Sequence, residues 1–152
     1  MFLHLLSAAQ RRAFCRLAQL LMRADQVVDI REEVALEGCL AEMGLSKADL
    51  PPAPASLDEV LPELEAFDTL ERRKLLLLEL TVVLCADRDV DPGEVDAMQV
   101  LLERLDVEAE LLPRLQAWAA DYHQLLERGR ALLAPEWDQS GEGWIEDDEG
   151  QA

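Results

Sequence analysis

Apolar residues recur along most of the chain at the three- and four-residue spacing of α-helices, and the two-residue alternation of strands is almost absent. The apolar faces of the first two predicted helices consist of Phe14, Leu17, Leu20 and Leu21, and of Leu36, Cys39, Leu40 and Met43. Gly44 is well placed to end the second helix as a C-cap. The next segment, 45–67, contains four prolines and predicts only short helical turns.

Three more helices are expected in the second part of the chain. Segment 70–86 is apolar nearly all round, which predicts a central helix packed on several sides. The next two helices have faces formed by Val95, Met98, Leu101, Leu102 and Leu105, and by Leu111, Leu115, Trp118, Tyr122, Leu125 and Leu132. Pro113 falls near the start of the last helix, where a missing N–H is tolerated.

The composition changes after Pro135. Every charged residue from Glu136 onward is acidic, and three glycines loosen the backbone. We therefore predict one compact all-α domain over residues 1–134, followed by a flexible acidic tail at 135–152.

Charge and cysteine usage narrow the class of protein. The 152 residues carry 32 acidic against 14 basic side chains, a formal net charge of -18. Such a surface repels phosphate, so we expect neither nucleic acid nor anionic membranes as partners; divalent cations and basic proteins are favoured. Three widely spaced cysteines in apolar patterns indicate buried free thiols in a reducing compartment. The most apolar stretch contains Glu79 and falls short of a membrane span. The apolar segment from Met1 to Gln10 has no basic region and is expected to be the start of a helix and not a signal peptide, which predicts a cytoplasmic protein.

An acidic segment occurs twice. Residues 24–32 align without gaps on residues 86–94, with Ala, Asp, Val, Asp and Glu in the same order and register. Each copy follows an apolar helix and precedes an amphipathic one, so the chain is expected to contain two similar helix–acidic-turn–helix halves.

At these residues the chain resembles the TerB-like (tellurite-resistance) family, which extends to the N-terminal region of the co-chaperone DjlA and has an A-D-G-x-[IV]-x-x-x-E turn between two helices. Gln26 and Arg88 stand where that pattern has glycine. The chain contains no His-Pro-Asp triplet, which excludes a J-domain role.

The resemblance implies an all-α fold, a stress-response association, no catalytic activity, work within protein complexes and divalent-metal binding. The metal ligands that it implies are Asp25, Asp29, Glu32, Asp87, Asp91 and Glu94. An all-oxygen site of this kind suits Ca²⁺ or Mg²⁺, with water or backbone carbonyls completing the shell.

Helix capping is the alternative role for four of these residues. Asp29 with Glu32, and Asp91 with Glu94, have the spacing of a capping box, and the same spacing occurs at Ser56 with Glu59 and at Asp68 with Glu71. Asp25 and Asp87 fall at the ends of helices, where the macrodipole disfavours a carboxylate, so a compensating cation or helix N-terminus is expected beside each.

Other candidate sites are weaker. The first three ligand positions of an EF-hand loop are matched by Asp87, Asp89 and Asp91, but Pro92 and Met98 then break the pattern. The segment from Asp138 to Glu149 in the tail matches such a loop better, but no exit helix is expected after it. We assign His4 and His123 structural or surface roles.

Aromatic residues suggest a second class of function, which is docking onto a partner protein. Trp118 and Tyr122 are expected in the core, whereas Trp137 and Trp144 are candidate anchors for a partner protein. The first hypothesis is a non-enzymatic module that binds cations weakly. The second is a metal-free domain that docks onto a basic partner through its acidic surface and tail.

Overall fold

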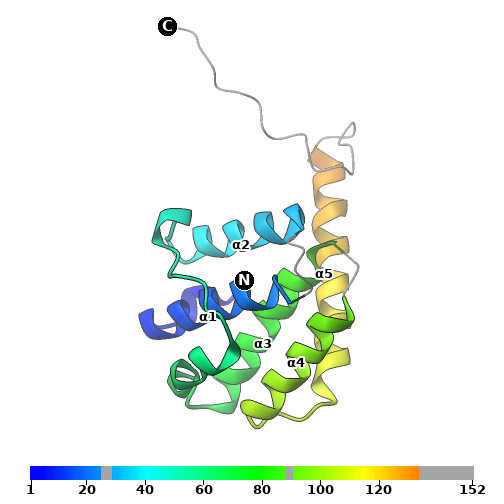
Figure 1. Cartoon of the computed structure of the whole chain (residues 1–152). Helices are drawn as coiled ribbons and strands as arrows, with labels where there is room; N and C mark the ends of the chain where they lie inside the picture. The colour runs from blue at the N-terminus through cyan, green and yellow to red at the C-terminus, as the bar shows by residue number, and fades with distance from the viewer. Residues whose placement is uncertain (25–28, 88–90, 134–152) are drawn as a thin grey trace, which may run out of the picture.

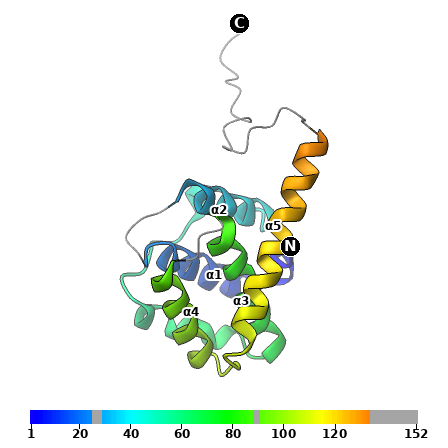
Figure 2. The same ribbon diagram turned by 90° about the vertical axis from the view of Figure 1, so that its right-hand side faces the viewer.

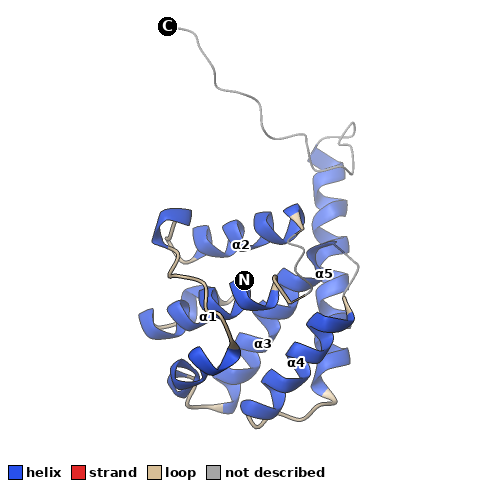
Figure 3. Ribbon diagram, viewed as in Figure 1, coloured by secondary structure: helices blue, strands red, loops and turns tan. Residues whose placement is uncertain are grey.

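The computed structural model describes residues 1–24, 29–87 and 91–133, with the backbone alone at Asp87. In this part of the chain there is no strand, and the elements are η1 (Leu3–Leu5), α1 (Ala8–Leu21), α2 (Ile30–Glu42), η2 (Lys47–Asp49), η3 (Leu57–Glu59), η4 (Leu61–Ala66), α3 (Leu70–Leu84), η5 (Cys85–Asp87), α4 (Pro92–Arg104) and α5 (Leu111–Leu133), where η marks a 3₁₀ helix (Figures 1 and 3). None of these helices has the length and apolar character needed to cross a membrane. The predicted tail lies outside the described residues.

Helix α3 forms the centre of the domain. It contacts α1, α2 and α5, and its buried side chains lie on every side of the helix. Helix α5 runs along one edge of the domain, and its C-terminal end projects beyond α2 (Figures 1 and 2). The short turns η2, η3 and η4 fill the proline-containing segment between α2 and α3, as the sequence predicts.

The N-caps of the first two helices recur 62 residues later at the next two. The N-caps of α1 and α3 are Ser7 and Thr69, and those of α2 and α4 are Asp29 and Asp91. Helices α2 and α4 each contain 13 residues. The recurrence therefore extends far beyond the acidic segment that the sequence comparison detects.

The C-terminal ends of α2 and α4 repeat at the same interval. The N–H of Leu45 donates to the carbonyl of Leu40 at 2.8 Å, and the N–H of Val107 donates to that of Leu102 at 3.0 Å. These are the long bonds of Schellman motifs, which require a left-handed residue at the turn. Gly44 fills this position in α2 with φ of 70°, as predicted, and Asp106 fills it in α4 with φ of 53°.

Two arginines tie the helices of each pair together. Arg11 of α1 donates from Nη1 to the carbonyl of Met43, the residue that caps α2, at 3.1 Å. Arg73 of α3 makes the equivalent bond to the carbonyl of Leu105, which caps α4, at 3.0 Å. A guanidinium at a helix C-terminus satisfies an orphan carbonyl and favours the negative end of the macrodipole.

Glu79 is an acidic residue buried in the core. Its side chain is 1% exposed, and its Oε1 accepts the N–H of Phe2 at 2.6 Å. The ammonium group of Met1 lies 3.5 Å from the same carboxylate and also pairs with Glu42. Burial raises the pKa of Glu79 above its ordinary value. The η1 segment is thereby fastened to α2 and α3.

Three local predictions are wrong. Helix α3 is capped by Thr69, whose hydroxyl accepts the N–H of Arg72, and not by Asp68. Ser56 makes no side-chain cap bond because a single 3₁₀ turn follows it. The first helix does not run from Met1, because the chain is extended at Leu6 and Ser7 before α1 starts.

Replacing Gly44 with Ala should destabilise the protein by about 1 kcal/mol, because a Cβ is strained at positive φ. Gly38 is the matched control. It lies on the exposed side of α2, and a Cβ added at either glycine would meet nothing within 4 Å. Gly38→Ala should stabilise the protein by about 1 kcal/mol through helix propensity alone. Urea unfolding measures both, and shifts of the same sign would contradict this assignment.

Candidate functional site

The first acidic turn ends in a complete capping box. Asp29 is the N-cap of α2, and its Oδ1 accepts the N–H of Arg31 at 2.7 Å. Glu32 reaches back, and its Oε2 accepts the N–H of Asp29 at 3.2 Å. This confirms the capping interpretation for both residues.

The second turn repeats this geometry. Asp91 caps α4 through a 2.6 Å bond from the N–H of Gly93 to Oδ1, and Glu94 accepts the N–H of Asp91 at 3.2 Å. Pro92 occupies the first helical position, where its fixed φ favours helix initiation. The two cap geometries differ by no more than 0.1 Å in either bond.

Both capping glutamates are buried. Glu32 is 2% exposed and Glu94 is 4% exposed, which is unusual for a carboxylate because burial removes its hydration. Each makes interactions beyond its cap bond. Glu32 and Glu94 are therefore structural parts of the turns.

The other two predicted ligands fall at the edge of the described structure. Asp25 lies outside it. Asp87 is the last residue of η5, which continues directly from α3, so its backbone lies where the sequence predicts, at the end of a helix. The carbonyls at such an end carry the negative pole of the macrodipole.

The described ends of the two acidic turns lie close together. Gly93, at the start of α4, is close to the end of the other helix pair: a Cβ added there would lie 3.8 Å from the carbonyl oxygen of Ala24. The second contact is between η5, which leads into the second turn, and α2, which follows the first turn. The structure thus brings into one region two turns that are far apart in sequence, which the sequence alone left open. Within the described part, no three His, Cys, Asp or Glu residues are grouped as metal ligands.

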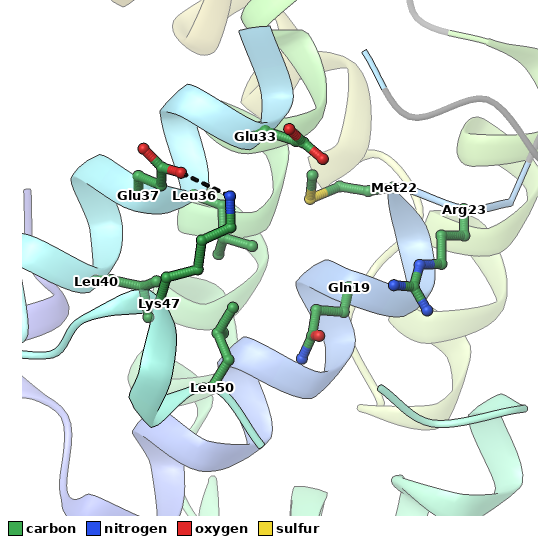
Figure 4. Close-up of a pocket in the computed structure, with 9 residues that line it drawn as sticks. All are labelled: Gln19, Met22, Arg23, Glu33, Leu36, Glu37, Leu40, Lys47 and Leu50. Atoms are coloured by element: carbon green, nitrogen blue, oxygen red, sulfur yellow. Dashed lines mark hydrogen bonds and ion pairs between the residues drawn. The ribbon is translucent and has the colours of Figure 1, made fainter. Parts of the chain in front are cut away.

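A shallow groove lies beside the first turn. It has a volume of about 140 Å³ and lies between the end of α1, α2 and η2 (Figure 4). Its lining consists of Gln19, Met22, Arg23, Glu33, Leu36, Glu37, Leu40, Lys47 and Leu50. Lys47 Nζ donates to Glu37 Oε1 at 3.0 Å across its rim. The groove has room for one side chain, whereas typical metabolite sites start at about 300 Å³.

The histidines and cysteines have structural surroundings. His4 is 60% exposed beside Glu42, and His123 Nε2 bonds the carbonyl of Val82 at 2.8 Å. All three cysteines are buried free thiols, as predicted. Burial raises the pKa of Cys15 to about 11 and, with help from Glu79, that of Cys39 to about 12. Both thiols are therefore protonated at neutral pH and poor nucleophiles.

Trp118 corrects the expectation that the last helix buries its aromatic face. Its ring stacks on Tyr122 with centroids 5.6 Å apart, but 40% of the residue is exposed. The buried residues of α5 are Leu111, Leu112, Leu115 and Ala119, and Tyr122 packs half-buried against Val82, Cys85 and Ala119. Periodicity identified the apolar face of α5 correctly, but it did not show how much of that face the domain covers. Trp137, Trp144 and the loop-like match from Asp138 to Glu149 lie outside the described residues.

The fold and the turns define an all-α helical domain with two adjacent, acidic, capped turns. Comparisons with models of known protein families, with curated protein sequences and with solved structures find no match to this chain.

The capping role predicts a specific stability pattern. Asp29→Ala and Asp91→Ala should each lower the free energy of unfolding by about 1 kcal/mol, because an N–H of the first helical turn loses its acceptor. Asn caps as well as Asp, so Asp29→Asn and Asp91→Asn should keep most of that stability. Urea denaturation distinguishes the two outcomes. Equal losses in the Asn variants would mean that the negative charge, and not the cap bond, stabilises the turns.

Proposed function

We propose that this chain is a TerB-like, stress-associated module without catalytic activity, which binds a divalent cation weakly at its adjacent acidic turns and associates with other proteins. The observation that carries the proposal is that the described ends of the two turns, at Ala24 and Gly93, lie close together in a chain of net charge -18. The sequence gives each turn an Asp–Asp–Glu set. Ca²⁺ and Mg²⁺ are the cations that such oxygen ligands suit.

The internal recurrence supports the assignment to this class. The cap residues, the helix lengths, the Schellman motifs and the Arg11 and Arg73 bonds repeat at one interval, as expected for two similar helix–acidic-turn–helix halves. A domain over residues 1–134, an acidic tail at 135–152, a cytoplasmic location and a link to tellurite resistance belong to the same proposal.

Asp25 and Asp87 are the first ligands to test. A carboxylate at the end of a helix faces the negative pole of the macrodipole, and a bound cation would offset that repulsion. The caps at Asp29 and Asp91 use Oδ1, so the same carboxylates retain acceptor capacity for a cation. Glu32 and Glu94 are buried and hold the turns in shape.

Calorimetric titration of the metal-stripped protein with Ca²⁺, and then with Mg²⁺, should show saturable binding at one or two sites. Moderate salt is required because a charge of -18 attracts any cation diffusely. The double variant Asp25→Ala/Asp87→Ala should abolish the saturable heat and leave the helix content unchanged. Asp58→Ala/Asp68→Ala, which removes the same charge from exposed positions elsewhere, is the matched control and should bind as the parent does. Saturable binding that survives the loss of Asp25 and Asp87 would rule out the assignment of these ligands.

A metal-free interaction domain is the second candidate. It is favoured by the cap bonds, which give Asp29, Glu32, Asp91 and Glu94 a structural role that needs no cation. In this reading the acidic surface and the Trp-bearing tail dock onto a basic protein.

Binding of a lysine-rich peptide, followed by fluorescence anisotropy, tests the tail. Deleting residues 136–152 should weaken the peptide's affinity and leave the thermal midpoint of unfolding unchanged. Trp137→Ala/Trp144→Ala keeps the tail's charge and shows the contribution of the aromatic rings. Full affinity in the deletion variant would exclude the tail as the anchor.

A further inference from the structure

Helix α5 carries an apolar face that the domain covers in part at Tyr122, which packs half-buried against Val82, Cys85 and Ala119, and leaves open on either side of it. Trp118, Leu125 and Leu132 are 40%, 61% and 85% exposed, and they follow one another at seven-residue intervals along a single line of the helix. The buried residues of α5 all lie between Leu111 and Ala119, so exposure increases as the helix projects beyond α2 (Figures 1 and 2).

The spacing of this face is that of a coiled-coil seam. Trp118, Tyr122, Leu125, Gly129 and Leu132 follow one another at alternating intervals of four and three residues. We name these five residues the α5 seam. An a/d repeat of this kind places side chains where a second helix packs along the first at a small crossing angle.

The charges beside the seam have no partner on their own helix. Asp121 and Arg128 are seven residues apart, or about 10 Å along the axis, which is too far for an ion pair. No oppositely charged residue lies three or four positions from either one. Neither makes a hydrogen bond or ion pair with any other part of the chain that the structure describes.

We propose that the α5 seam binds the α5 seam of a second copy of this chain in antiparallel orientation. In an antiparallel pair each a position of one helix lies opposite a d position of the other. Tyr122 then lies opposite Leu125 of the second copy, and Trp118 lies opposite its Gly129. The same register places Asp121 beside Arg128 of the second copy, and the twofold axis repeats that ion pair.

Gly129 gives this register its steric support. A Cβ added to Gly129 would meet nothing within 4 Å in the single chain, so the domain itself does not require a glycine there. Glycine weakens a helix interior relative to alanine. Opposite the indole of Trp118, however, the missing side chain leaves the space that a large ring needs. A parallel pair would instead place Trp118 against Trp118 and Gly129 against Gly129, and it would leave both charges unpaired.

Analytical ultracentrifugation of the full chain, from about 1 to a few hundred micromolar, tests the pairing at the weak affinities expected of a short seam. We expect a reversible dimer. Asp121→Arg and Arg128→Asp should each weaken it by about tenfold or more, because each juxtaposes like charges twice. The double variant Asp121→Arg/Arg128→Asp should restore it, since the swapped pair is again complementary.

Gly129→Leu separates assembly from folding. It should weaken the dimer by filling the space opposite Trp118, while helix content and thermal stability stay equal or increase. A chain that remains monomeric at every concentration would overturn the proposal. So would a dimer that is indifferent to the charge variants, because another surface would then form it.

Discussion

Burial of α3 from Leu76 to its C-terminal end is the constraint on which the other helices depend. A helix that is apolar on every side is stable in water only when other elements cover all of its faces. Helices α1, α2 and α5 provide most of that cover, and η1 adds the backbone N–H of Phe2 for the buried carboxylate of Glu79. The order in which the helices surround α3 also decides that the two acidic turns become neighbours.

The acidic turns combine two physical requirements in few residues. A helix that begins directly after a tight turn needs acceptors for its first N–H groups, and an N-cap Asp with a Glu three residues later supplies them. Asp29 and Asp91 are only half-buried, so the N-cap residues also add negative charge to the surface. The capping role is visible in the hydrogen bonds of α2 and α4, and it explains why Glu32 and Glu94 are buried despite their charge. Cation binding, in our proposal, depends on Asp25 and Asp87.

Helix α5 illustrates how one amphipathic helix can serve two surfaces. Its first nine residues complete the cover of α3 through Leu112, Leu115 and Ala119. Its later turns extend past α2 (Figure 2), and Leu125 and Leu132 on these turns are exposed in the part of the chain that the structure describes. An apolar face that stays exposed beyond the core is a common mark of an interaction surface.

The sequence by itself determined the all-α class, the central position of segment 70–86, the C-terminal end of α2 at Gly44 and the N-caps at Asp29 and Asp91. Each of these follows from local patterns: three- and four-residue periodicity, a left-handed turn that favours glycine, or a side chain within reach of a nearby N–H. Thr69 shows the limit of that reach, because Asp68 and Thr69 are both good N-caps and the packing of α3 selects between them. Only the tertiary structure decided which helices surround α3, that the turns lie together, that Arg11 and Arg73 bond the ends of α2 and α4, and that Trp118 is exposed. These properties depend on contacts between residues far apart in the chain, and a periodic pattern shows which face of a helix is apolar without showing what covers it.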